Sequence, residues 1–135
     1  MNVTSIMSRE PVTVGMDDDL HRVKDLFELY RFHHLLVLLG EKLVGVISDR
    51  DLLRATSPFI GRASERPQDV ATLNRRVHQI MTRSLVVVTA ETPVQDAARL
   101  MLDKRVSCLP VVTDDDRLLG IVTWRDQLRS LLPPQ

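Results

Sequence analysis

GVISDRD at residues 45–51 returns as GIVTWRD at residues 120–126. The two heptapeptides start 75 positions apart in a chain of 135 residues, so each stands at a similar place in its own half. Internal repetition indicates that one supersecondary unit is used more than once, and it constrains the fold more strongly than a single motif. The sequence therefore predicts two copies of one structural unit.

The repetition extends beyond the heptapeptide. At an offset of 74, Ile6-Met7 matches Ile80-Met81, and one added residue in the second acidic turn changes the offset to 75. These matches place a first repeat at residues 1–56 and a second at 77–132. Residues 57–76 are expected to form a linker, which proline and glycine interrupt at its start and which is partly helical toward its end.

Each repeat carries the same succession of signals. β-branched runs at 11–14 and 85–89 predict a first strand. Apolar residues spaced by three and four then predict an amphipathic helix, starting after an acidic run in one repeat and after Thr92-Pro93 in the other. Two apolar runs and a short second helix follow. Each repeat is thus predicted to be β-α-β-β-α.

A unit of this size buries a sheet and two helices poorly on its own. Two such units gain a shared core if their sheets pack together around a pseudo-twofold axis. The predicted fold class is therefore α/β (α+β), with two β-α-β-β-α repeats in one compact module.

The bulk composition excludes several classes of protein. Lysine plus arginine and aspartate plus glutamate number 18 each, so no overall charge favours nucleic acid or an anionic membrane. The apolar runs are too short to span a membrane, and neither class of partner is expected. The single cysteine, Cys108, fits a reducing compartment, so a cytoplasmic location is predicted.

The repeat, the order of its elements and two copies of G-h-h-[ST]-x-x-D together resemble a tandem pair of cystathionine-β-synthase (CBS) domains, also called a Bateman module. The resemblance is to stand-alone bacterial CBS-pair proteins, including those of the acetoin-utilisation type. It implies a regulatory module with no enzymatic activity and no catalytic cofactor. It also implies a cleft between the repeats for AMP, ADP, ATP or S-adenosylmethionine, and a disk-shaped homodimer that acts on an unidentified target protein.

The heptapeptide itself has two interpretations. Ser48 or Thr123, three residues before Asp51 or Asp126, is close to a helix capping box. The same carboxylates, held at a helix start, could instead accept hydrogen bonds from both hydroxyls of a ribose. Because a cap that orients the aspartate also supports a ligand site, both interpretations stay open. The glycine of each heptapeptide marks close packing or a bulge.

The resemblance implies two cavities, each with a base side and a ribose side. The first combines Thr82, Val86, Val106 and Ser107 with Ser48, Asp51, His33 and His34. The second combines Ser8, Val12, Phe32 and His33 with Thr123, Asp126, Ser107 and Cys108. The family often carries His-Arg where His33-His34 stands, which favours the Asp51 cavity for a phosphorylated ligand, since histidine donates to phosphate.

Other interpretations remain. Both histidines could simply lie in the C-terminal turn of a helix. The first repeat has Leu35-Leu36-Val37 where the second has the family's Leu-Pro-Val, which leaves the local backbone less fixed. Both acidic motifs could be only caps in a ligand-free dimerisation or interaction scaffold. Metal-ligand spacing and a nucleophile-base-orienter set are absent from the sequence, so neither a metal site nor a hydrolase is expected, and Cys108 is expected to be a buried apolar residue.

Overall fold

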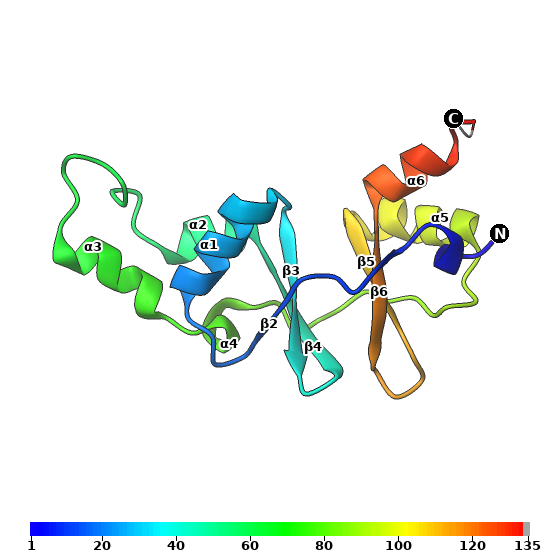
Figure 1. Ribbon diagram of the computed structural model, residues 1–135, viewed down its shortest axis with the longest axis horizontal. Coiled ribbons are helices and arrows are strands. Elements are labelled where there is room, and N and C mark those ends of the chain that lie inside the picture. Colours follow the sequence, from blue (N-terminus) through cyan, green and yellow to red (C-terminus); the bar gives the residue numbers. More distant parts are fainter. Residues whose placement is uncertain (134–135) are drawn as a thin grey trace. The chain divides into compact units, whose positions relative to one another are not determined.

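The computed structural model describes residues 1–133, and its contacts divide the chain into two compact units. Unit 1 contains residues 1–11, 41–43 and those from 86 onward, and unit 2 contains residues 12–40 and 44–85. Each unit contributes one three-stranded sheet with helices beside it (Figure 1). The predicted mixed fold with two sheets is confirmed, whereas the packing of one sheet on the other stays a prediction.

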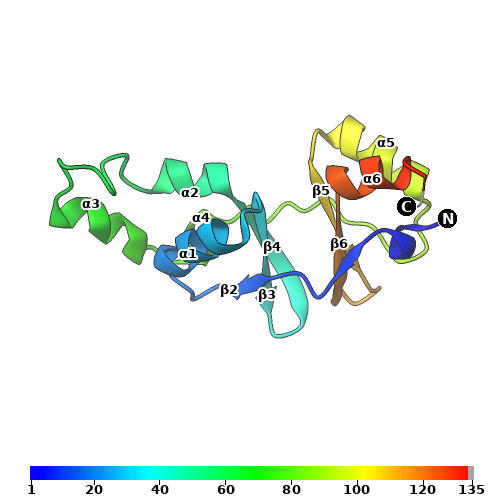
Figure 2. The same ribbon diagram turned by 45° about the horizontal axis from the view of Figure 1, so that its top comes forward.

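Unit 2 is built around the sheet β2-β3-β4. Strand β2 runs parallel to β3, with Val14 opposite Val37. Helices α1, α2 and α4 gather beside this sheet (Figure 2). The elements are β2 (Thr13–Gly15), α1 (Leu20–Tyr30), β3 (His34–Leu39), β4 (Lys42–Ser48), α2 (Asp49–Ala55), α3 (Pro67–Ala71), the 3-10 helix η2 (Thr72–Asn74) and α4 (Val77–Ile80).

Helix α1 follows the predicted pattern. Its start is capped by Asp19, whose carboxylate accepts from the Arg22 amide at 3.2 Å. Leu20 and Val23 are fully buried on the face that the spacing predicted, and they pack in one core with the β3 residue Val37. The helix ends at Tyr30, and the next residue, Arg31, adopts the left-handed conformation with φ 57°.

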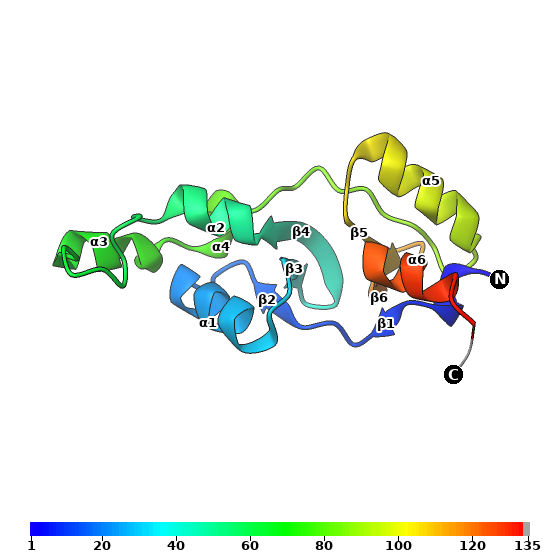
Figure 3. The same ribbon diagram turned by 90° about the horizontal axis from the view of Figure 1, so that it is seen from above.

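Unit 1 holds the sheet β1-β6-β5. Helices α5 and α6 lie side by side in this unit (Figure 3). Its core combines apolar residues of β5 and β6 with Ala97 and Met101 of α5, and Val3 and Val88 complete it. The elements are η1 (Val3–Ser5), β1 (Ser8–Arg9), α5 (Val94–Lys104), β5 (Cys108–Val112), β6 (Leu118–Thr123) and α6 (Trp124–Ser130).

The first strand predicted for the second repeat differs from the structure. Residues 85–89 form only a single parallel bridge, Val88 with Val111, where the first repeat has a three-residue strand. The Val88 amide donates to the Pro110 carbonyl at 3.0 Å. Because Pro110 has no N–H group, it cannot return a hydrogen bond to extend the ladder. Leu36 stands at that position in the first repeat and has the missing donor.

Each repeat lends its first segment to the sheet formed by the other. Thr82, from the start of the second repeat, exchanges backbone hydrogen bonds with Val46 of β4 at 2.8 and 3.0 Å. Correspondingly, Ser8 of the first repeat lies opposite Ile121 of β6. The units defined by contacts therefore combine segments of both sequence repeats. The repeat boundaries at 1–56 and 77–132 remain proposals about sequence units.

The two heptapeptide glycines lie where these borrowed segments approach. A Cβ added at Gly120 would stand 2.6 Å from the Ser8 carbonyl oxygen and 2.9 Å from the Met7 sulfur. At Gly45 it would stand 2.6 Å from the Met81 sulfur. The sequence interpretation as close packing thus has a specific cause, the pairing of β6 and β4 with a segment from the other repeat.

The linker is partly helical, as expected. The Asp69 carboxylate accepts from the Arg66 amide at 2.8 Å at the start of α3 and from the Ser57 hydroxyl at 2.7 Å. Leu73 of η2 is buried in the core of unit 2. Across residues 1–133, none of the helices has the length and apolar character needed to cross a membrane.

Candidate functional site

Helix α2 begins with the capping box that the sequence predicted. The Asp51 amide donates to the Ser48 hydroxyl at 3.0 Å, and the Asp51 carboxylate oxygen Oδ2 accepts from the Ser48 amide at 2.8 Å. Both residues are half-buried. Within the described chain, the hydrogen bonds found for this carboxylate use Oδ2, so Oδ1 is available to an incoming donor.

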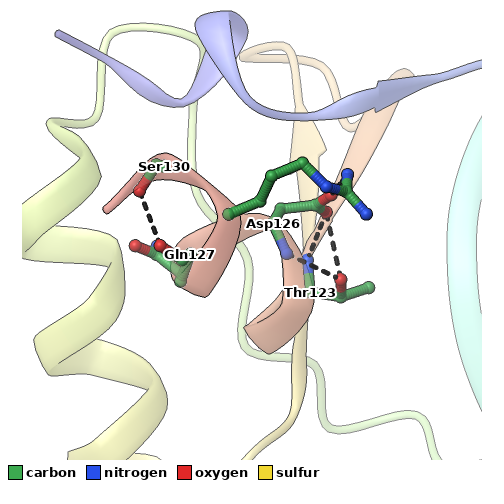
Figure 4. A network of polar contacts seen from close by, with 5 residues as sticks. Thr123, Asp126, Gln127 and Ser130 are labelled. Atoms are coloured by element: carbon green, nitrogen blue, oxygen red, sulfur yellow. Dashed lines mark hydrogen bonds and ion pairs between the residues drawn. The ribbon is translucent and has the colours of Figure 1, made fainter. Parts of the chain in front are cut away.

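The corresponding box at α6 is more completely occupied (Figure 4). Oδ2 of Asp126 accepts from the Thr123 amide at 2.8 Å and from the Thr123 hydroxyl at 3.1 Å. The Arg129 guanidinium lies 3.5 Å from Oδ1. Only 8% of the Asp126 side chain is exposed. Both oxygens therefore have protein partners, and a ribose would have to compete with them.

His33 and His34 lie beside the start of α2. The Asp49 amide donates to the His33 carbonyl at 3.0 Å, and Nδ1 of His33 lies 2.9 Å from the Asp49 carboxylate. The equivalent backbone bond in unit 1 joins the Trp124 amide to the Ser107 carbonyl at 3.1 Å. The repeats therefore fix this turn identically in the backbone and differ in the side chains that it presents.

The electrostatics of this turn follow from burial and from two acids. Burial lowers the pKa of His34, and Asp49 and Asp51 only partly oppose this effect. Partial desolvation alone would raise the pKa of Asp49, but the hydrogen bond with the His33 ring and the charge of that ring outweigh it, so the pKa is lowered. At neutral pH, Asp49 is therefore ionised and His34 is held toward its uncharged form.

The structure places the predicted site residues in both units. Unit 2 contains Ser48, Asp51, His33, His34, Thr82, Val12 and Phe32. Unit 1 contains Val86, Val106, Ser107, Cys108, Ser8, Thr123 and Asp126. Within unit 2, the backbone bonds between Val46 and Thr82 bring Thr82 to β4, the strand that ends at Ser48. The complete residue sets of the two cavities stay predictions.

Sequence reasoning missed Asp49 as a site residue. The available signal was a second carboxylate at the first position of α2, two residues before Asp51. Trp124 occupies this position at α6, and the Arg125 guanidinium lies over its ring at 5.6 Å. The acidic pair at α2 therefore has no equivalent in the second repeat.

Cys108 is buried at the start of β5, as expected for a small apolar residue. Burial raises the pKa of its thiol to about 11, so it is not a thiolate at neutral pH. Among residues 1–133, histidine, cysteine and acidic side chains form no cluster suited to a metal ion. That this protein binds no metal stays a prediction from the sequence.

Comparison with known proteins identifies a family whose model matches most of the chain. The model of the CBS domain matches residues 3–57 and 77–132. A CBS domain-containing protein of Dictyostelium discoideum is 34% identical over 98% of this chain and 97% of its own length. Inosine-5'-monophosphate dehydrogenase of Methanocaldococcus jannaschii is 30% identical over 96% of this chain, which spans 23% of that enzyme's length.

Solved structures agree with this match. A CBS domain pair in complex with 5'-methylthioadenosine and S-adenosyl-L-methionine is 27% identical, has a TM-score of 0.78 and is matched over 96% of this chain and 94% of its own. CBSX2 in complex with AMP is 30% identical, with a TM-score of 0.80 over 96% and 94% of the two chains. A putative acetoin utilization protein from Vibrio cholerae is 26% identical, with a TM-score of 0.80 over 96% and 90%.

Proposed function

The chain belongs to the CBS domain family, and from this premise we propose that it is a regulatory module without catalytic activity that binds an adenosine-containing ligand. Similar structures contain AMP, or 5'-methylthioadenosine with S-adenosyl-L-methionine, which supports this ligand class. The candidates therefore include AMP, ADP, ATP and S-adenosylmethionine. The observation that carries the proposal is the Asp51 carboxylate, which is fixed by one oxygen and presents the other.

In the proposed complex, Asp51 accepts hydrogen bonds from the ribose hydroxyls through Oδ1. The Ser48 cap holds the carboxylate in one orientation, so little side-chain freedom is lost when the ligand binds. Thr82 adds a hydroxyl from the adjoining segment of unit 2. A hydrogen bond to a charged group contributes roughly 1.5 to 3 kcal/mol, and micromolar affinity requires about 8 kcal/mol. Apolar contacts with the base must therefore supply much of the affinity.

The ribose assignment is tested by isothermal titration of the chain with S-adenosylmethionine, 5'-methylthioadenosine, AMP and ATP. We expect at least one of them to bind and Asp51→Ala to weaken that binding at least about tenfold, because the charged acceptor is lost. Asp25→Ala is the matched control, since Asp25 is an exposed acid on α1 of the same unit. Unchanged affinity in Asp51→Ala would remove the ribose role from Asp51.

A second candidate, a ligand-free scaffold, is favoured by two features of unit 1. The carboxylate of Asp126 is buried and has partners at both oxygens, so it serves fully as a cap. Trp124, Leu128 and Leu131 leave large apolar surfaces exposed at α6. This candidate predicts self-association without any response to adenosyl compounds. Sedimentation of the chain with and without each compound distinguishes it from the regulatory module.

Homodimerisation and a regulated target protein are part of the proposed function. Regulation requires that the ligand has different affinity for two states of the module, for example two association states. The same sedimentation series therefore also tests whether ligand binding changes the association state. The cytoplasmic location stays a prediction from the sequence.

A further inference from the structure

We propose that the unit 2 site around Asp51 selects adenosyl compounds whose 5' group is uncharged or cationic over compounds that carry phosphate there. This inference rests on the proposed function and specifies its ligand class. It differs from the sequence expectation, in which His33 and His34 favoured a phosphorylated ligand at this site. Three features of the start of α2 carry it, and all three lie within unit 2.

The amides that could hold a phosphate are already used. The Asp49 amide donates to the His33 carbonyl at 3.0 Å, and the Asp51 amide donates to the Ser48 hydroxyl at 3.0 Å. The Arg50 amide is close enough to the Asp49 carboxylate to lower the pKa of that carboxyl group. Phosphate binding at a helix start depends on amides that point at the ligand without another partner. Two of the first three amides of α2, those of Asp49 and Asp51, therefore do not meet this condition.

The histidines bring little positive charge to a ligand. His33 is paired with Asp49 at 2.9 Å, so a proton on its ring is balanced by that carboxylate. His34 is half-buried, and the charged groups that act on it are Asp49, Asp51 and His33. Burial outweighs the two acids and favours its neutral form. A neutral histidine does not offset the charge of a phosphate.

Two carboxylates complete the environment. The cluster contains two carboxylates, Asp49 and Asp51, and at most one positive charge, on the His33 ring that is paired with Asp49. It therefore carries net negative charge at neutral pH. Arg31, at the end of α1, and Arg50 have exposed side chains, where solvent and salt screen their charges. A 5'-phosphate would meet the acidic pair, whereas a thioether would be indifferent to it and a sulfonium would be attracted.

The test compares three ligands of different charge at the same site. Titrations near pH 7.5 use S-adenosylmethionine, 5'-methylthioadenosine and AMP with the full chain and with Asp49→Asn. With the unmodified chain, we expect the first two to bind about tenfold or more tightly than AMP. AMP binding equal to or tighter than that of 5'-methylthioadenosine would overturn the inference while leaving the proposed function intact.

Asp49→Asn should change the affinities of the three ligands in different directions, according to the charge of each ligand. Removing one negative charge should tighten AMP binding about threefold, weaken S-adenosylmethionine about threefold and leave 5'-methylthioadenosine within about twofold. Asp25→Asn makes the same charge change at an exposed position of unit 2 and should leave all three unchanged. A common shift of all three ligands in Asp49→Asn would overturn the electrostatic origin. Absence of binding by all three, and by ADP and ATP, would overturn the proposed function as well.

Discussion

Val46 and Thr82 exchange two backbone hydrogen bonds, with N to O distances of 3.0 and 2.8 Å, although they belong to different sequence repeats. Ser8 and Ile121 form the equivalent pair in unit 1. Each unit thus depends on a short segment from the other repeat. The heptapeptide glycines are the residues that make this pairing sterically possible.

Replacing Gly120 with alanine should therefore destabilise the fold. The new Cβ would stand 2.6 Å from the Ser8 carbonyl oxygen, which belongs to the backbone and cannot rotate away. We expect a loss of about 1 to 3 kcal/mol in the free energy of unfolding, measured with denaturant. Gly45→Ala should cost less, because its nearest contact is the flexible Met81 side chain.

Gly15→Ala is the control for these variants. Its nearest neighbour would be the Asp18 carboxylate at 3.7 Å, an ordinary contact distance. It should leave the free energy of unfolding almost unchanged. If Gly120→Ala were as stable as Gly15→Ala, the close approach of Ser8 to β6 would not hold in solution.

The two motif aspartates should differ in their effect on stability. Asp126→Ala removes a carboxylate whose side chain is only 8% exposed and leaves the part-buried Thr123 amide and hydroxyl without their acceptor, which should cost about 1 to 3 kcal/mol in the free energy of unfolding. Asp51→Ala removes one capping acceptor from a half-buried place and should cost about 1 kcal/mol. Thermal and denaturant unfolding measure both, with exposed Asp103 of α5 changed to alanine as the control.

If Asp51→Ala and Asp126→Ala lost the same free energy of unfolding, the difference in burial and hydrogen bonding between the two capping boxes would be contradicted. The sequence could not predict that difference, because Arg54 and Arg129 occupy equivalent positions in the two repeats. Among the described residues, an ion pair between this arginine and the motif aspartate is found in the second repeat, where Arg129 pairs with Asp126. Such a contact depends on the tertiary surroundings of each helix and not on the spacing of the motif.

Stability should depend on pH through His34. Its folded pKa lies below the ordinary 6.5, so the unfolded chain binds a proton more readily. The stability that neutral His34 contributes to the folded state is fully present above pH 6.5, and it is lost as the pH falls through the lowered pKa. The pKa of Asp49 lies below 3.8, so acid effects at that residue occur in a separate, lower range.

The free energy of unfolding should consequently fall between about pH 7.5 and 5.5, and His34→Gln should reduce this fall. His78→Gln provides a comparison at another half-buried histidine of unit 2, for which the fall should persist. Denaturant titrations at the two pH values measure the difference. An identical pH dependence in His34→Gln and the unmodified chain would remove His34 as its source.

Much of the fold could be predicted from the sequence, because repeated patterns specify local structure. The helix start at Asp19 and the strand that ends at Ser48 follow from capping and β-branched residues. The shortening of the first strand in the second repeat could have been predicted from Pro110, which lacks a donor. The pairing of Ser8 with β6 could not, because a two-residue strand has almost no local signal.

The candidate site was predictable in its caps and less so in its charges. The spacing of Ser48 and Asp51 indicated the capping box that the structure contains. The spacing does not indicate how deeply His34 is buried, and burial decides its protonation. The ion pair of His33 with Asp49 also forms only because the fold brings these two residues together. The ligand preference inferred for this site therefore depends on tertiary structure.

The most direct test of the account is a titration of the ¹⁵N-labelled chain with 5'-methylthioadenosine, followed by amide chemical shifts. We predict saturable shifts at the amides of Ser48, Asp51 and Thr82, and in Asp51→Ala the shifts at Ser48 and Thr82 should disappear. Saturable shifts elsewhere, with these three amides unmoved, would contradict the site, and a spectrum unaffected by this ligand, S-adenosylmethionine, AMP and ATP would contradict adenosyl binding itself.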